Sequence, residues 1–142
     1  MKIKKVLITS TSFAKADSSP IDLLTENGWE ISRNKGPYED EQLAKLIEDV
    51  DAIIVGNDIV GEKSISAAKK LKTIIVHGTG IDNIDSEAAT RVGIRVLNTH
   101  HTNAMAVAEF VFAALMSLTR HIQKGRESLR SGEWAGSSFV GM

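Results

Sequence analysis

The sequence predicts an α/β fold: a parallel five-stranded sheet with helices on both faces, followed by a long apolar helix. Three observations support this prediction. Short apolar segments alternate with amphipathic ones over the first hundred residues, which is the pattern of successive β-α units. Glycines end several of these segments. A segment that is apolar almost throughout then follows, and it is a different class of element.

The elements of the sheet are expected in strict alternation. Strands are predicted at residues 3–9, 29–32, 51–55, 73–76 and 94–97, and helices at 21–27, 39–49, 63–70 and 86–91. Pro20 suits the first turn of its helix, with Ser18 or Ser19 as the cap. Right-handed crossovers bring the carboxyl ends of the strands to one edge, where ligands bind in flavodoxin-like folds. The loops 10–14, 56–58, 77–82 and 98–103 are therefore expected at a ligand-binding edge.

The segment 104–116 is apolar except for Glu109. A helix that is apolar on every side is expected to be buried on every side. A helix from Asn103 to Ile122 would be about 30 Å long, which is more than one small sheet can cover, so it needs a second domain or a second subunit. It is too short and too interrupted to span a bilayer. Further on, Trp134 favours another contact of this kind, with an exposed tail as the alternative.

Composition narrows the classes of function. The chain has 142 residues, 42% of them hydrophobic and 25% charged, which fits one ordinary domain, or one domain with part of another. A formal net charge of −1 gives no reason to expect a nucleic-acid or membrane-surface partner. The lack of cysteine excludes disulfides and thiolate nucleophiles. The short apolar run near the N-terminus does not resemble a signal peptide, and a cytoplasmic location is expected.

Gly78, Thr79 and Gly80 follow a predicted strand. A dinucleotide fingerprint needs a third glycine, but that place holds Asn83, and Asp82 would bring a carboxylate close to a phosphate. Glycines also let backbone N–H groups approach an anion, so this loop can hold a small carboxylate. A tight turn without any ligand explains the same residues equally well.

No metal site is expected. Asp85 or Ser86 is better explained as a helix cap and Asn83 as a turn former. The pair His100-His101 lacks carboxylates at ligand spacing. We interpret the two residues as loop histidines that line a substrate pocket.

Motifs along the second half of the chain carry a family resemblance. They are Leu71-Lys72, His77-Gly-Thr-Gly-Ile-Asp-Asn-Ile-Asp85, Glu87-Ala-Ala-Thr90, Gly93-Ile94, Val96-Leu-Asn-Thr99, Val107-Ala-Glu109, Arg120 and Leu129-Arg-Ser-Gly-Glu-Trp134. The sequence resembles the D-isomer-specific 2-hydroxyacid dehydrogenases, most closely their 3-phosphoglycerate dehydrogenase branch. One departure is His100, which stands where the family usually has a proline.

The resemblance implies that two segments of the chain have different roles. Residues 1–99 would be the N-terminal part of a substrate-binding domain, and 100–142 a crossing helix and dimer arm that lead into an NAD-binding domain. The backbone of Gly78, Thr79 and Gly80 would hold the substrate carboxylate. The position of Thr99 resembles one beside the nicotinamide, and Asn103 one that lines the substrate pocket. The helix from Asn103 to Ile122 and the Trp134 region would form a homodimer.

The expected function is therefore part of an NAD(P)-dependent oxidoreductase that acts on the CH–OH group of a small D-2-hydroxy acid, with 3-phosphoglycerate as a candidate substrate. The family's glycine fingerprint, its arginine and its acid–histidine pair match nothing in this chain, so no catalytic residue is assigned and the chain by itself is expected to be inactive and to bind NAD weakly. The alternative is a stand-alone small-acid-binding or dimerisation module. A phospho-receiver domain is excluded because the loop Thr9-Ser-Thr-Ser12 lacks acidic residues.

Overall fold

The computed structural model describes residues 4–140 and divides into two compact units, one reaching to His100 and the other beginning at His101. The first unit contains a five-stranded sheet, and the second contains helices only. Each unit is described by itself below.

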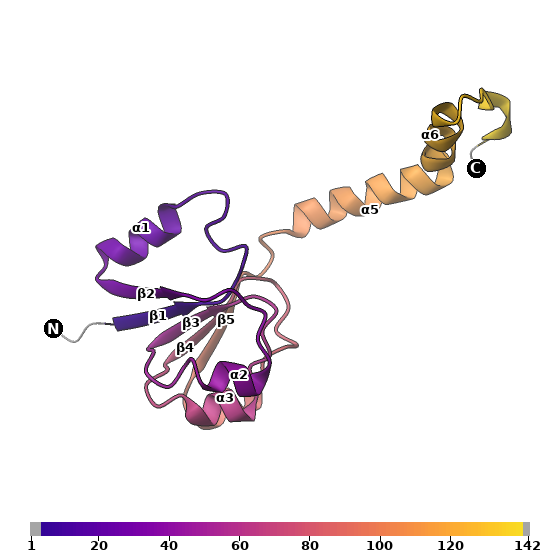
Figure 1. Cartoon of the computed structure of the whole chain (residues 1–142). Helices are drawn as coiled ribbons and strands as arrows, with labels where there is room; N and C mark the ends of the chain where they lie inside the picture. Colours follow the sequence, from indigo (N-terminus) through magenta and orange to yellow (C-terminus); the bar gives the residue numbers. More distant parts are fainter. Residues whose placement is uncertain (1–3, 141–142) are drawn as a thin grey trace. The chain divides into compact units, whose positions relative to one another are not determined.

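The sheet of the first unit is parallel throughout, with the strand order β2-β1-β3-β4-β5 (Figure 1). Its strands are β1 (Lys4–Ile8), β2 (Trp29–Arg33), β3 (Ala52–Val55), β4 (Thr73–Val76) and β5 (Arg95–Asn98). The predicted parallel five-stranded sheet is thus confirmed, with strand ends that differ from those expected by at most one residue. Residue 3 of the first predicted strand lies outside the described residues.

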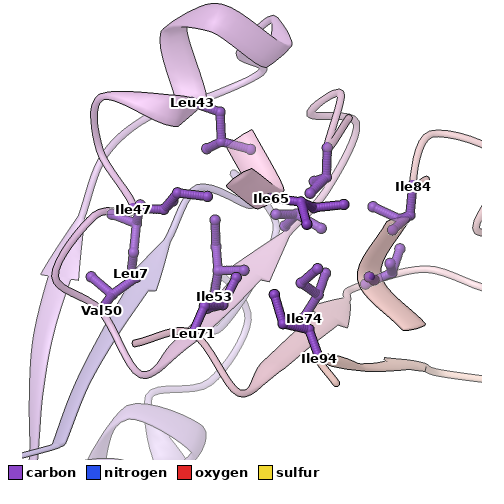
Figure 2. Packing of buried hydrophobic residues seen from close by; sticks show 14 of the residues in the cluster. Leu7, Leu43, Ile47, Val50, Ile53, Ile65, Leu71, Ile74, Ile84 and Ile94 are labelled. Atoms are coloured by element: carbon purple, nitrogen blue, oxygen red, sulfur yellow. The ribbon is translucent and has the colours of Figure 1, made fainter. Parts of the chain in front are cut away.

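Helices cover both faces of the sheet. They are α1 (Ser19–Glu26), α2 (Asp40–Ala44), α3 (Glu62–Ala67) and α4 (Ser86–Arg91). Figure 1 shows α1 on one face and α2 with α3 on the other. The larger core lies on the α2–α3 face, where Leu43 and Ile65 meet Ile53 and Ile74 of the sheet (Figure 2). On the opposite face, Ile21 and Leu24 of α1 pack against a smaller cluster around Ile54.

The helix predicted over 39–49 is shorter than expected. A capping box between Glu39 and Gln42 begins α2, which ends at Ala44. The acidic residues that follow would lie at the carboxyl end of a longer helix, where the helix dipole disfavours negative charge. The prediction of the buried face was nevertheless correct, because Leu43 and Ile47 are completely buried within this unit.

The second unit consists of α5 (Ala104–Thr119), α6 (Ile122–Arg130) and a short 3-10 turn, η1 (Gly136–Ser138). The single helix predicted from Asn103 to Ile122 is interrupted because His121 adopts a left-handed conformation, with φ of 53°. The axes of α5 and α6 differ by 60°. No described helix is by itself long and apolar enough to cross a bilayer, although this bent pair together reaches the required length and composition.

The apolar helix is not covered by the described residues. No residue of α5 is buried, and Phe110 keeps 73% of its surface exposed. This exposure fits the expectation that the helix needs a second domain or a second subunit as its cover, and which of these it has stays a prediction. That α5 crosses into a further domain stays a prediction.

Candidate substrate site

Four loops meet at the carboxyl edge of the sheet, as the parallel topology requires. They form two adjoining hollows. The larger, of about 390 Å³, is lined by Gly56, Asn57 and most of the segment 76–83. The smaller, of about 90 Å³, is lined by residues 9–12, Gly36-Pro37 and residues 56–58. His77 belongs to the lining of both hollows.

The loop Gly78-Thr79-Gly80 is anchored through its carbonyl groups. The backbone N–H of Thr99 donates to Gly78 O over 3.0 Å, and Asn98 Nδ2 donates to Thr79 O over 2.6 Å. The N–H groups of these three loop residues donate to no other described residue. Backbone N–H groups without acceptors beside an open hollow are suited to bind an anion. We call this loop the glycine cradle.

Neither backbone conformation nor packing within the chain demands a glycine at position 78. Its φ lies outside the left-handed region that Gly28, Gly93 and Gly132 occupy. A Cβ atom at Gly78 would meet only Val76 Cγ1, at 3.8 Å, which is ordinary van der Waals contact. A glycine that the fold itself does not need leaves space for something else, and this favours an anion site over a tight turn without ligand.

A buried carboxylate supports the floor of the site. The side chain of Asp58 is only 1% exposed. Its Oδ2 accepts hydrogen bonds from Thr9 Oγ1 (2.7 Å) and Gly56 N (3.0 Å), and its Oδ1 accepts one from Tyr38 N (2.9 Å). These bonds tie the loops after β1, β2 and β3 together. Sequence reasoning missed Asp58, although an acidic residue just after a buried strand is a usable signal.

Asn83 and Asp85 have structural roles. Asn83 Nδ2 donates to Gly56 O and to Asp58 O, at 3.1 and 2.7 Å. Asp85 caps α4, because its Oδ1 accepts from Ala88 N at 2.8 Å. The predicted cap is thus confirmed. Among the described residues, no group of three potential metal ligands is found.

His77 is the site residue that the sequence indicated least. Its Nδ1 lies 3.1 Å from Ser10 Oγ and 3.0 Å from Ser12 Oγ, and its ring meets the ring of Phe13 edge-on, with centroids 5.5 Å apart. All three partners come from the loop after β1. The sequence predicted that the loops after β1 and β4 lie at the same edge of the sheet. It did not predict which residues of the β1 loop contact His77.

The predicted site residues fall into two groups. Gly78, Thr79, Gly80 and Thr99 lie together in the first unit, joined by the hydrogen bond from Thr99 N to Gly78 O. Asn103 belongs to the second unit, directly before α5, and its side chain makes no capping hydrogen bond. His101 also belongs to that unit. Its part in the substrate pocket, like that of Asn103, stays a prediction.

The described residues do not form a dinucleotide site. The position of a third glycine is taken by Asn83, which anchors the floor of the hollow, and Asp82 adds a carboxylate to the lining beside the glycine cradle. A pyrophosphate would meet negative charge and no helix N-terminus with the required glycines. The hollow is suited to one small carboxylate instead.

The first unit is a parallel α/β domain whose hollows lie at the carboxyl edge of the sheet, where ligands bind in this class of fold. Comparison with known proteins identifies the family. The model of the D-isomer specific 2-hydroxyacid dehydrogenase catalytic domain matches residues 6–132. The chain therefore belongs to the D-isomer specific 2-hydroxyacid dehydrogenase family.

Relatives extend well beyond the matched part. A D-3-phosphoglycerate dehydrogenase of Sus scrofa is 34% identical over 140 residues, which is 98% of this chain and 25% of that protein. A crystal structure from Thermus thermophilus has a TM-score of 0.83 at 30% identity and covers 97% of this chain and 45% of its own. The NAD⁺-bound 3-phosphoglycerate dehydrogenase of Entamoeba histolytica has a TM-score of 0.74 at 30% identity, over 84% and 40% of the two chains. The chain thus spans about a quarter of the length of the curated relatives it matches.

Proposed function

We propose that this chain is the substrate-binding part of an NAD-dependent oxidoreductase that acts on the CH–OH group of a small D-2-hydroxy acid. The observation that carries the proposal is the glycine cradle: three backbone N–H groups that donate to no described residue, in an open hollow, at a glycine that packing among the described residues does not require. Backbone donors of this kind bind a carboxylate and fix the orientation of the attached C2 carbon.

The remaining roles rest on the family. NAD⁺, bound by a further domain, would accept the hydride that leaves the C2 carbon of the substrate. Thr99, bonded through its N–H to Gly78 O, would stand beside the nicotinamide, and Asn103 would line the substrate pocket. No acid–base residue is assigned in this chain, and we expect it to catalyse no turnover by itself. Relatives that include D-3-phosphoglycerate dehydrogenase make 3-phosphoglycerate one candidate substrate.

The second unit is proposed to form a homodimer. Its helix α5 exposes Phe110, Phe112 and Leu118 at 73%, 64% and 74% of their surface, and Trp134 is 85% exposed. Exposed large apolar side chains of this extent mark a contact surface. A second copy of the chain, or a further domain of a longer protein, would remove this surface from water.

The cradle is tested by Gly78→Ala. The added methyl group has room in the fold but narrows the hollow that Gly78 lines, so we expect the chain to fold normally and to lose carboxylate binding. Binding of D-lactate is measured by amide chemical-shift titration of the ¹⁵N-labelled chain. Gly125→Ala, within α6, is the matched control and should leave binding unchanged, because its new Cβ meets only Phe139 Cδ2 at 4.0 Å.

Two results would count against the proposal. One is an unperturbed set of amide signals for residues 78–80 at saturating D-lactate in the unmodified chain. The other is equal affinity for D-lactate in Gly78→Ala and the unmodified chain.

An acid-binding or dimerisation module is the second candidate, and the exposed apolar side chains of α5 favour its dimerisation. The two candidates differ in their larger context. Oxidation of NADH with a 2-oxo acid by the native protein, followed by absorbance, supports the enzyme, and its absence together with a native mass near 15.4 kDa supports the module.

A further inference from the structure

Three polar atoms gather beside the glycine cradle, and we call them the His77 corner. Ser10 Oγ and Ser12 Oγ lie 3.1 and 3.0 Å from His77 Nδ1 and 3.3 Å from each other. The backbone of His77 is fixed to β3, because its N–H donates to Val55 O over 2.8 Å. The edge-on contact with the ring of Phe13 fixes the ring plane as well. The imidazole is thus held in one orientation.

This orientation leaves one ring nitrogen for a ligand. Nδ1 is occupied by the two serine hydroxyls, whereas Nε2 forms no hydrogen bond with any described residue. When Nδ1 accepts from a serine hydroxyl, Nε2 carries the proton and donates. A neutral imidazole in this tautomer offers a single directional donor to the hollow.

The corner lies where the second end of a small acid would come. His77 lines both hollows and directly precedes Gly78, so its Cα is about 3.8 Å from the Cα of the first cradle residue. An acid that places its carboxylate on the cradle has its C3 substituent within reach of this junction when C3 is turned toward His77. The smaller hollow on the far side is lined mainly by hydroxyl groups and backbone, with Pro37 as its apolar member.

The charges of the two hollows favour a neutral substituent. Asp58 lines the smaller hollow and Asp82 the larger one, and among the described residues neither lysine nor arginine lines either. Arg33 and Lys35 line a third hollow, at the end of β2, which shares Ser10 and Thr11 with the smaller one. Arg33 Nη2 already donates to Phe13 O over 2.9 Å. In the two hollows that His77 lines, a phosphate dianion would meet two carboxylates and, in the described part of the chain, no lining cation to compensate them.

We propose that the His77 corner determines substrate specificity: it selects a 2-hydroxy acid with an uncharged hydroxyl group on C3, over acids with a methyl group or a phosphate there. His77 Nε2 is the contacting donor, and Ser10 and Ser12 are positioning residues that hold the ring. The inference rests on the proposed function, because it assumes that the carboxylate occupies the glycine cradle.

Three acids that differ only at C3 test it: D-lactate, D-glycerate and D-3-phosphoglycerate. Their dissociation constants are measured by amide titration of the full ¹⁵N-labelled chain. One added hydrogen bond corresponds to a preference of roughly three- to tenfold, so D-glycerate should bind that much more tightly than D-lactate, with D-3-phosphoglycerate weakest. His77→Asn keeps a polar atom near the Nδ1 position and loses the outer donor, so it should bind D-lactate and D-glycerate equally. His77→Gln carries an amide near the Nε2 position and should retain part of the preference.

The outcomes separate the two proposals. If no acid shifts the signals of residues 78–80, the cradle and the proposed function fail, and the specificity inference falls with them. If D-lactate binds at the cradle but D-glycerate binds no better, or if His77→Asn keeps the preference, only the specificity inference is overturned. Tighter binding of D-3-phosphoglycerate than of D-glycerate overturns it as well. Thermal unfolding of each variant, expected close to that of the unmodified chain because His77 is not part of the core, shows that the fold is retained.

Discussion

Replacing Asp58 with alanine should destabilise the first unit strongly. The carboxylate accepts hydrogen bonds from Thr9 Oγ1, Gly56 N and Tyr38 N, and it is almost completely buried. A hydrogen bond contributes about 1 kcal/mol net, and a buried donor left without an acceptor costs about 1–3 kcal/mol. Three donors would lose their acceptor at once, and some would regain water. We therefore expect the free energy of unfolding to fall by about 3–5 kcal/mol, which is a large fraction of the 5–15 kcal/mol typical of a domain.

Urea unfolding followed by the fluorescence of Trp29, which packs against the smaller core cluster, measures this loss. The control is Asp58→Asn, which has the same shape and keeps one acceptor oxygen. Its amide oxygen can accept from Thr9 and Gly56, while its NH₂ group would face Tyr38 N, so only about one bond is lost and a smaller effect is expected. A loss below about 1 kcal/mol for Asp58→Ala, or equal losses for both variants, would refute the view that this carboxylate joins the three loops.

Three further predictions concern other parts of the chain. Gly36→Ala would overlap Asp58 Oδ1 and press on Thr9 O, and it should lower the free energy of unfolding by about 1–3 kcal/mol in the same assay, whereas Gly125→Ala should not. Hydrogen bonds from Lys70 and Lys5 lower the pKa of Asp49 to about 2 from its ordinary 3.8, so its contribution to stability is present above pH 4 and is lost as the pH falls from 4 toward 2. Asp49→Asn should therefore flatten this acid limb in thermal melts, and a limb of unchanged slope would argue against it. Phe110→Asp should shift the chain toward monomer in sedimentation velocity, and Gln123→Asp, which adds the same charge to α6, should not; equal behaviour of the two would exclude this face of α5 from the contact.

Much of the first unit follows from its sequence because local and global preferences agree there. The run Asp51-Ala-Ile-Ile-Val55 has the continuous apolar character of a strand buried on both faces, and β3 occupies the centre of the sheet with all of its residues buried. The predictions fail where a periodic pattern of apolar residues continues beyond the end of the helix. The apolar spacing of Leu43, Ile47 and Val50 predicted one continuous helix, yet the helix ends at Ala44, and the irregular segment after it still buries Ile47 and Val50.

The second unit shows a different limit. The composition of α5 predicted a helix correctly. Whether that helix is buried depends on the domain or subunit that surrounds it, and the sequence of one chain does not contain that information. Leu118 is 74% exposed although its neighbours in sequence are apolar. The break at His121 was missed because a left-handed conformation at a histidine depends on the path of the following helix more than on the residue type.

The candidate site shows why a motif and a site are different things. From the residues alone, Gly78-Thr79-Gly80 was equally compatible with an anion nest and with an empty turn. Two facts that no sequence pattern carries favour the anion nest. The carbonyls of Gly78 and Thr79 accept hydrogen bonds while the three N–H groups donate to no described residue, and the φ of Gly78 lies outside the left-handed region. The same neighbourhood changes which histidine matters. In the sequence, the adjacent histidines His100 and His101 indicated a function, whereas His77 is a single residue within a motif and did not. The fold gives His77 two serine partners and a place between two hollows. Because of this position, binding experiments on His77 variants can decide whether the site prefers a hydroxyl or a phosphate group at C3 of the acid.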